Sequence, residues 1–238
     1  LLGCAPTGSG KSGAFIIPTL FLSSVDDALV YNTQSNIDNS TSTTTSSSKT
    51  NKNNKKKSKT TQQPNPSNNG KIRSLLLAPS RELASQLHRE VERLGTGKFR
   101  GLRSALLSGS NAGKLTSSSS DGGRGLDVLV ATPMRLVECL RNGEEHGRKL
   151  DLGSVRIVIL DEADRLLDSG DGFSSSFSSS SSSNNNNNNN FKTFLGQIDT
   201  IFFELPPTAT RALFSATVGS NVRSLAKSIL RDPLDLSI

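Results

Sequence analysis

Short apolar runs alternate along this chain with longer stretches in which apolar residues recur every three or four positions. Such runs are typical of buried strands, and the longer periodic stretches are typical of amphipathic helices. Strands are predicted at residues 1–5, 73–78, 101–107, 126–131, 155–160, 211–214 and 234–238. Because strands that alternate with helices form parallel sheets, the predicted fold class is α/β, with a mostly parallel sheet and helices on both faces.

Two stretches show the helical period most clearly. The first stops at Gly95 and has its apolar face at Leu83, Ala84, Leu87, Val91 and Leu94. Glycine often follows the last turn of a helix, which favours an end at this point. The second begins near Asn221 and has its apolar face at Val222, Leu225, Ala226, Ile229 and Leu230. Each helix is predicted to pack this face against the sheet.

Two segments have the composition of disordered inserts. Residues 32–70 are mostly Ser, Thr, Asn, Gln and Lys, and residues 169–190 end in poly-Ser and poly-Asn tracts. Neither can bury enough apolar surface to offset the conformational entropy lost on ordering. Without these 39 and 22 residues, 177 of the 238 remain, which is the size of one domain with one core.

The formal net charge of the chain is +7, but most of it lies in the first insert. Six lysines and one aspartate give residues 32–70 a net charge of +5, which leaves +2 elsewhere. A solubilising loop explains this insert at least as well as an arm that contacts nucleic acid, so charge alone identifies no partner. No apolar run is long enough to cross a membrane, and no membrane partner is expected.

A phosphate-binding loop (P-loop) is predicted where the first strand meets a helix. Its eight residues are Ala5, Pro6, Thr7, Gly8, Ser9, Gly10, Lys11 and Ser12. The glycines let backbone N–H groups approach phosphates, Lys11 adds a positive charge for the β- and γ-phosphates, and the Ser12 hydroxyl can ligate Mg²⁺. Ala5 stands where the stricter pattern has glycine. The alternative is a Gly/Ser turn before a helix, which a partner motif would exclude.

An acidic turn supplies that partner motif. The apolar strand at 155–160 is followed directly by Asp161, Glu162, Ala163 and Asp164. In open α/β sheets ligands bind at the carboxyl ends of the strands, where the P-loop is also expected. Asp161 can hold Mg²⁺ there, partly through water, and Glu162 can orient or deprotonate an attacking water. The alternative is that these acids only stabilise the N-terminus of the next helix.

Five ordered motifs give the chain a family resemblance. They begin at Ala5, Ala78, Ala131, Asp161 and Ser215, and they read APTGSGKS, APSREL, ATPMRL, DEAD and SAT. In this order they resemble the first RecA-like domain of DEAD-box RNA helicases. The resemblance implies a RecA-like P-loop fold, ATP and Mg²⁺ as cofactors, RNA as a partner, and catalytic roles for Lys11, Asp161 and Glu162.

Two strand-to-helix junctions are predicted to contact RNA. Their residues are Pro79, Ser80 and Arg81 in one, and Thr132, Pro133 and Arg135 in the other. Ser80 and Thr132 are also good N-cap residues, and capping is compatible with phosphate binding at the same helix N-terminus. By resemblance, these junctions bind the RNA backbone without reading bases. The family's Gly-Gly turn is missing; its nearest match is Gly109, which alternatively only marks a turn.

Ser215 and Thr217 follow another strand, again at its carboxyl end. Their hydroxyls can hydrogen-bond the carboxylates of the acidic turn, which includes Asp164. The resemblance implies that this contact couples ATP use to unwinding. The alternative is an N-cap for the helix that begins near Asn221.

With the resemblance, these motifs predict the ATP-binding core of an RNA helicase that hydrolyses ATP to separate short RNA duplexes. Residues 83–90 and 212–217 resemble the nucleolar subfamily that assists ribosomal RNA processing. That likeness implies pre-ribosomal protein partners and a nuclear, nucleolar location, with the cytoplasm as the alternative. Two other functions stay open, a non-catalytic RNA-binding assembly factor and a DNA-directed P-loop motor. Intact Lys11 and Glu162 argue against the first, and the PSREL and TPMR segments argue against the second.

The chain is also expected to be a fragment, because it starts at Leu1 inside a predicted strand without an initiating Met. By resemblance, a second RecA-like domain supplies arginines to the γ-phosphate, and a glutamine motif upstream of the P-loop reads adenine. Residues 1–238 are therefore expected to form one N-terminally truncated ATP-binding domain, without the second domain and with weak activity alone.

Overall fold

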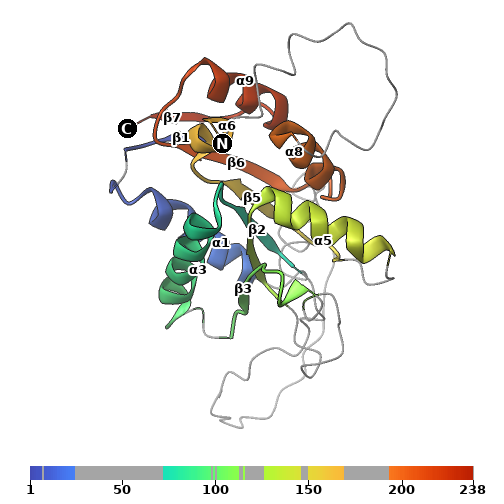
Figure 1. The fold of residues 1–238 in the computed structure, drawn as a ribbon. Helices are drawn as coiled ribbons and strands as arrows, with labels where there is room; N and C mark the ends of the chain where they lie inside the picture. Colours follow the sequence, from blue (N-terminus) through green and yellow to red (C-terminus); the bar gives the residue numbers. More distant parts are fainter. Residues whose placement is uncertain are drawn as a thin grey trace, which may run out of the picture. The chain divides into compact units, whose positions relative to one another are not determined.

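Seven parallel strands form one sheet within the described part of the chain (Figure 1). They are β1 (Leu2–Cys4), β2 (Ser74–Leu77), β3 (Ser104–Leu106), β4 (Val128–Ala131), β5 (Ile157–Leu160), β6 (Thr210–Ser215) and β7 (Asp235–Ser237). Their order is β3-β4-β2-β5-β6-β1-β7, and every neighbouring pair is parallel. Each strand overlaps the range predicted for it, so the parallel α/β fold is confirmed.

The computed structural model describes residues 1–6, 8–24, 72–97, 99, 101–112, 115, 126–145, 150–168 and 193–237. Thr7 and the two predicted inserts, residues 32–70 and 169–190, lie outside the described residues. The described residues all belong to one of the two compact units of the chain, which comprises Leu1–Ser24 and Asn68–Ile238.

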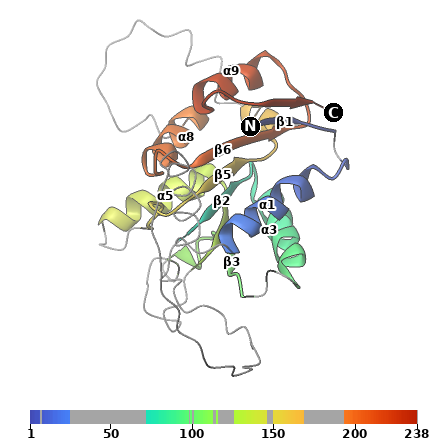
Figure 2. The ribbon, with the colours of Figure 1, turned by 180° about the vertical axis from the view of Figure 1, so that it is seen from behind.

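Helices cover both faces of the sheet, as predicted. On one face lie α1 (Lys11–Ser24) and α3 (Arg81–Gly95), which contact each other (Figure 1). On the other face lie α5 (Pro133–Glu145), α6 (Ala163–Asp168), α8 (Phe194–Phe203) and α9 (Ser220–Ile229) (Figure 2). The central strands β2, β4 and β5 are therefore buried at every position, which explains why they read as nearly continuous apolar runs.

Alternate residues of each strand feed two hydrophobic cores. In β2, Leu76 packs in the core beneath α1 and α3, whereas Leu75 and Leu77 pack in the core on the other face. In β1, a Cβ at Gly3 would lie 2.5 Å from the ring of Phe214, so this close approach requires glycine. The same ring contacts Phe15 of α1 with a centroid separation of 4.8 Å, which ties the helix after the P-loop to β6.

The boundaries of α3 follow from its caps. The Ser80 hydroxyl accepts a hydrogen bond from the Leu83 N–H at 3.2 Å, which is the predicted N-cap. The helix ends at Gly95, as predicted, but its C-cap is Thr96 in an extended conformation. The glycine in the left-handed region is Gly97, with φ of 98°, so the chain reverses two residues beyond the predicted stop.

Two elements differ from the sequence-based expectation. The strand predicted at 101–107 begins only at Ser104, because Gly101 has a left-handed φ of 102°. Helix α8 was not predicted, since its residues mix Gly196 with β-branched and aromatic side chains. Two sequence features could have indicated this helix: Thr193 as an N-cap residue, and apolar residues at helical spacing, which are buried. In the structure the Thr193 hydroxyl accepts a hydrogen bond from the Gly196 N–H.

Among the described residues, none of the helices has the length and apolar character needed to span a membrane. Cys4 and Cys139 are both free thiols. Burial raises the pKa of the Cys139 thiol, which keeps it protonated and inert in the core.

Candidate nucleotide and nucleic-acid sites

The predicted P-loop joins β1 to α1. Gly8 and Gly10 have φ of 85° and 89°, a left-handed conformation that residues with a Cβ rarely adopt. Helix α1 begins at Lys11, so the backbone N–H groups of its first turn point toward the loop. Glycine is thus favoured at these two positions for two reasons: it adopts the left-handed conformation, and it lets a phosphate approach the backbone closely.

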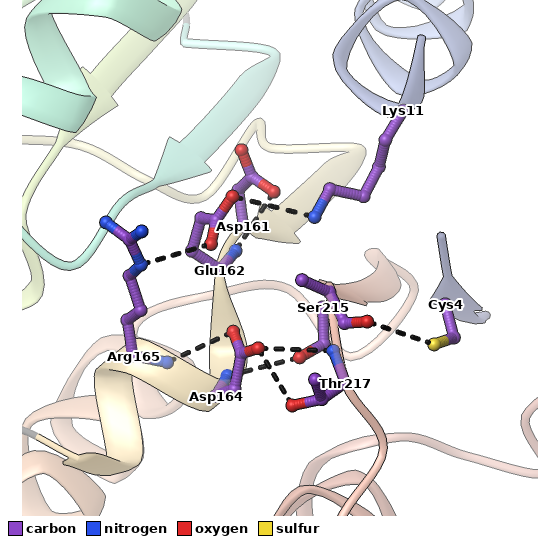
Figure 3. Close-up of polar contacts among 9 residues, drawn as sticks. Cys4, Lys11, Asp161, Glu162, Asp164, Arg165, Ser215 and Thr217 are labelled. Carbon is purple, nitrogen blue, oxygen red and sulfur yellow. Dashed lines mark hydrogen bonds and ion pairs between the residues drawn. The ribbon is translucent and has the colours of Figure 1, made fainter. Parts of the chain in front are cut away.

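The side chain of Lys11 is buried, and its Nζ donates no hydrogen bond. Its nearest charged partner is Glu162 Oε1, at 3.6 Å (Figure 3). A buried ammonium without hydrogen-bond partners is energetically costly, because it has lost its hydration. A bound anion would therefore supply the hydrogen-bond acceptors that the Lys11 ammonium lacks among the described residues.

Asp161 follows β5 and is buried beside Lys11. Burial raises the pKa of its carboxyl group to about 6, although the positive charge of Lys11 acts in the opposite direction. Its Oδ1 accepts a hydrogen bond from the Glu162 N–H at 2.9 Å, and its own N–H donates to Leu77 O. Asp161 is thus held rigidly at the carboxyl end of β5, in a position where its negative charge lacks full compensation.

Glu162 adopts a left-handed conformation with φ of 54°, which is unusual for a residue with a long side chain. Its two carboxylate oxygens face two cations: Oε1 lies 3.6 Å from Lys11 Nζ, and Oε2 lies 3.6 Å from Arg165 Nε (Figure 3). Strained backbone of this kind is concentrated at functional sites. Sequence reasoning missed Arg165, which an acidic and a basic residue three positions apart at the start of a helix could have indicated.

Asp164 connects the acidic turn with the loop after β6 (Figure 3). Its Oδ2 accepts hydrogen bonds from Thr217 Oγ1 at 3.0 Å and from the Thr217 N–H at 3.1 Å. Its own N–H donates to Ser215 Oγ at 3.2 Å, so this hydroxyl bonds the backbone of the turn. Partial burial raises the pKa of Asp164, but these hydrogen bonds outweigh burial and lower the pKa overall. The alternative N-cap role is wrong, because Gly219 caps α9.

The loop after β6 also contacts the strand that leads into the P-loop. The Ala5 N–H donates to Ser215 O at 3.2 Å, and Cys4 Sγ donates to Ala216 O at 3.7 Å. Ser215 thus lies between the P-loop and the acidic turn. One backbone and one side-chain hydrogen bond thus join residues more than 200 positions apart, and no sequence pattern pointed to Cys4.

The two predicted RNA-binding junctions meet at a pocket of about 270 Å³. Four of the predicted residues line it: Arg81, Gly109, Thr132 and Arg135. Pro79 and Ser80 precede α3, and Pro133 is the first residue of α5, as predicted. Helix α3 follows β2 and α5 follows β4, so both N-termini, where backbone N–H groups lack intrahelical partners, lie at the carboxyl ends of these strands.

An asparagine organises the turn that replaces the Gly-Gly pair. Asn111 Oδ1 accepts from the Ser108 N–H at 2.8 Å, and its Nδ2 donates to Leu106 O at 2.7 Å. This local bonding holds the loop that contains Gly109. A Cβ at Gly109 would lie 3.3 Å from Nη2 of Arg135, so glycine here permits a close contact with the guanidinium group. Sequence reasoning missed Asn111, although asparagine in a turn is a recognised signal.

A P-loop after one parallel strand and an acidic turn after another define a nucleoside-triphosphate-binding domain of the RecA-like class. Within this class, the chain belongs to the DEAD/DEAH box helicase family, whose model matches residues 1–225.

Proteins similar to this chain carry RNA helicase names. ATP-dependent RNA helicase ROK1 of Scheffersomyces stipitis is 31% identical over 239 residues, which cover 100% of this chain and 31% of that protein. ROK1 of Yarrowia lipolytica is 32% identical over 242 residues, which cover 100% of this chain and 32% of that protein. ATP-dependent RNA helicase CHR1 of Candida albicans is 30% identical over 100% of this chain and 30% of that protein. The chain spans about a third of the length of these curated relatives.

Solved structures share the fold. A DEAD box protein from the hyperthermophile Methanococcus jannaschii superposes with a TM-score of 0.60 at 22% identity, over 99% of this chain and 44% of that one. S. cerevisiae Dbp5 bound to RNA and ADP BeF3 superposes with a TM-score of 0.59 at 21% identity, over 100% of this chain and 41% of that one. The predicted RecA-like fold is confirmed.

Proposed function

We propose that the protein to which this chain belongs is an RNA-dependent ATPase that separates short RNA duplexes, and that these residues form its ATP-binding core. The observation that carries the proposal is the buried Lys11 Nζ, which has no hydrogen-bond partner and lies between a P-loop and two carboxylates. A triphosphate offers this ammonium the oxygen acceptors that the protein does not. Membership of the helicase family supports the same reaction.

The same site fits Mg²⁺. The Ser12 hydroxyl and the Asp161 carboxylate are the oxygen ligands that this ion prefers, with the remaining positions filled by water and phosphate. Burial makes the charge of Asp161 unfavourable in the protein alone, and a divalent cation reverses that penalty. When bound, Mg²⁺ supplies charge neutralisation on the phosphates. Ser12 and Asp161 would hold the ion, Lys11 would bind the β- and γ-phosphates, and Glu162 would accept a proton from the attacking water.

RNA would bind at the pocket between the two junctions. Arg81, Thr132 and Arg135 line it, and the N-termini of α3 and α5 add backbone N–H donors. Such groups bind phosphate oxygens and contact no base edge, so recognition is expected to be independent of sequence. The RNA helicase names of the relatives support this choice of nucleic acid.

A second RecA-like domain would complete the active site in the full-length protein. The chain covers 31% of one relative's length, so that protein has room for such a domain. In this proposal Asp164, Ser215 and Thr217 transmit the nucleotide state to the arrangement of the two domains.

We further propose that the full-length protein acts in ribosomal RNA processing in the nucleolus, with pre-ribosomal proteins as partners. This proposal rests on the subfamily resemblance of residues 83–90 and 212–217. Crosslinking of bound RNA from cells tests this assignment.

ATP hydrolysis by the full-length protein, measured with single-stranded RNA and with DNA of the same sequence, tests the function. RNA should stimulate turnover and DNA should not. Lys11→Ala should reduce turnover by at least about a hundredfold, because the phosphates lose their cation. Glu162→Gln should retain ATP binding and trap the closed complex with RNA. Turnover that survives in both variants would refute these roles, and equal stimulation by DNA would favour a DNA-directed motor.

A further inference from the structure

Arg135, in the first turn of α5, is held by a short ion pair. Its Nη1 donates to Glu138 Oε2 at 2.7 Å, one turn further along the same helix. The Arg135 and Glu138 side chains are 32% and 40% exposed, so the pair lies at the surface of the pocket rather than in the core. The pair fixes the orientation of a guanidinium group that otherwise rotates freely about several bonds.

The opposite edge of the same guanidinium group lies against the turn that contains Gly109. Nε is buried and donates no hydrogen bond, and Nη2 lies beside Gly109, where a Cβ would approach it to 3.3 Å. Nη2 carries two N–H groups, and a hydrogen bond from a charged guanidinium group to a phosphate oxygen is stronger than one between neutral groups. Arg135, Gly109 and Arg81 all line the pocket of about 270 Å³.

We propose that Glu138 is a positioning residue for RNA binding. By holding Nη1, it fixes the guanidinium group beside Gly109, where Nη2 would donate to a backbone phosphate in the pocket. Gly109 serves the same arrangement, because its missing side chain leaves room for Nη2. This inference rests on the proposed RNA-binding function and adds two residues that act through Arg135.

Simple electrostatics predicts the opposite effect. A carboxylate near a polyanion repels it, so removal of Glu138 by charge alone should tighten RNA binding. An exposed ion pair between residues three apart contributes only a few tenths of a kcal/mol to stability, so the fold does not depend on it. Weaker RNA binding after removal of the Glu138 charge would therefore indicate that Glu138 positions Arg135, whereas tighter binding would indicate charge repulsion.

The experiment measures binding of a fluorescent oligouridylate to the full-length protein, with a non-hydrolysable ATP analogue present. Glu138→Gln should weaken binding by about twofold, because Arg135 loses the preferred orientation that a weak ion pair provides. Glu138→Asp keeps the charge but shortens the reach to Nη1, and it should weaken binding similarly. Glu90→Gln is the matched control: Glu90 forms the same kind of pair with Arg93, at 2.8 Å on α3, and neither residue lines the pocket.

A double-mutant cycle identifies the route of the effect. In an Arg135→Gln background, Glu138→Gln and Gly109→Ala should cause no further loss of affinity. Gly109→Ala alone should weaken binding, since its Cβ displaces the guanidinium group. If Glu138→Gln binds RNA as tightly as Glu90→Gln does, the inference is wrong. If Arg135→Gln itself leaves RNA affinity unchanged, the proposed RNA contact fails instead, which distinguishes the two outcomes.

Discussion

The buried carboxylate of Asp161 lowers the stability of the nucleotide-free protein. Burial raises its pKa to about 6, so the folded chain binds a proton that the unfolded chain releases near pH 4. Between about pH 4 and about pH 6 the folded state therefore carries the extra proton, and the free energy of unfolding falls as the pH rises. The position suited to hold Mg²⁺ is thus unfavourable for the protein alone.

We predict that Asp161→Asn stabilises the protein at neutral pH in the absence of Mg²⁺ and nucleotide. The expected gain in free energy of unfolding is about 2 kcal/mol, and it should disappear as the pH is lowered toward about 4. The amide introduced by this substitution keeps an oxygen that can accept the Glu162 N–H. Urea unfolding in EDTA across this pH range measures the effect.

Asp151→Asn is the control for that measurement, because Asp151 is exposed and its replacement removes the same formal charge. It should leave the pH dependence of unfolding unchanged. If the Asp161→Asn protein keeps the wild-type pH dependence of unfolding between about pH 4 and about pH 6, the account of Asp161 is wrong.

At the scale of elements, α6 and the end of β6 are joined through one carboxylate. Asp164 in α6 accepts two hydrogen bonds from Thr217, and its backbone donates to Ser215. The loop that carries these residues also contacts Ala5 and Cys4. A movement of the acidic turn would therefore be transmitted through these hydrogen bonds to the loop after β6, which supports the proposed coupling role.

We predict that Thr217→Val in the full-length protein uncouples hydrolysis from unwinding. Valine has nearly the shape of threonine but lacks the hydroxyl that donates to Asp164, while the backbone N–H of residue 217 still bonds it. The rate of ATP hydrolysis should stay within about twofold of wild type. The number of duplexes separated per ATP hydrolysed should fall by about fivefold, which corresponds to the free energy of about one hydrogen bond.

The matched control for this variant is Thr200→Val, which removes a hydroxyl that bonds Gly196 O within α8. It should change neither rate. An unchanged ratio of unwinding to hydrolysis in Thr217→Val would show that the Asp164 contact is only structural.

At the scale of the whole molecule, the described domain brings the P-loop, the acidic turn and the pocket between the two predicted RNA-binding junctions to the carboxyl ends of its parallel strands. We predict that residues 1–238 alone bind nucleotide weakly and do not unwind RNA, whereas the full-length protein does both. Affinity for a fluorescent ATP analogue and strand separation, measured side by side for the two proteins, give the comparison. Efficient unwinding by residues 1–238 would overturn the proposal that a second domain is required.

Several features of this protein were predictable from sequence because their causes are local. Strands shielded on both faces need apolar residues at every position, so β2, β4 and β5 are visible as runs. The P-loop glycines follow from backbone conformation, and the Ser80 cap follows from the chemistry of a helix N-terminus. Helix α8 was not visible, because its composition obscured the helical period that tertiary packing enforces.

The sequence by itself determined the fold class and the chemical nature of the site, since P-loop and acidic turn are each set by a few adjacent residues. Only the tertiary structure decided their environments. The raised pKa of Asp161 depends on burial, and the lack of hydrogen bonds at Lys11 Nζ depends on which groups surround it. The bonds from Thr217 to Asp164 and the approach of Gly109 to Arg135 join residues distant in sequence. Such properties arise from long-range packing, which excludes water and brings charges together, and no local pattern encodes them.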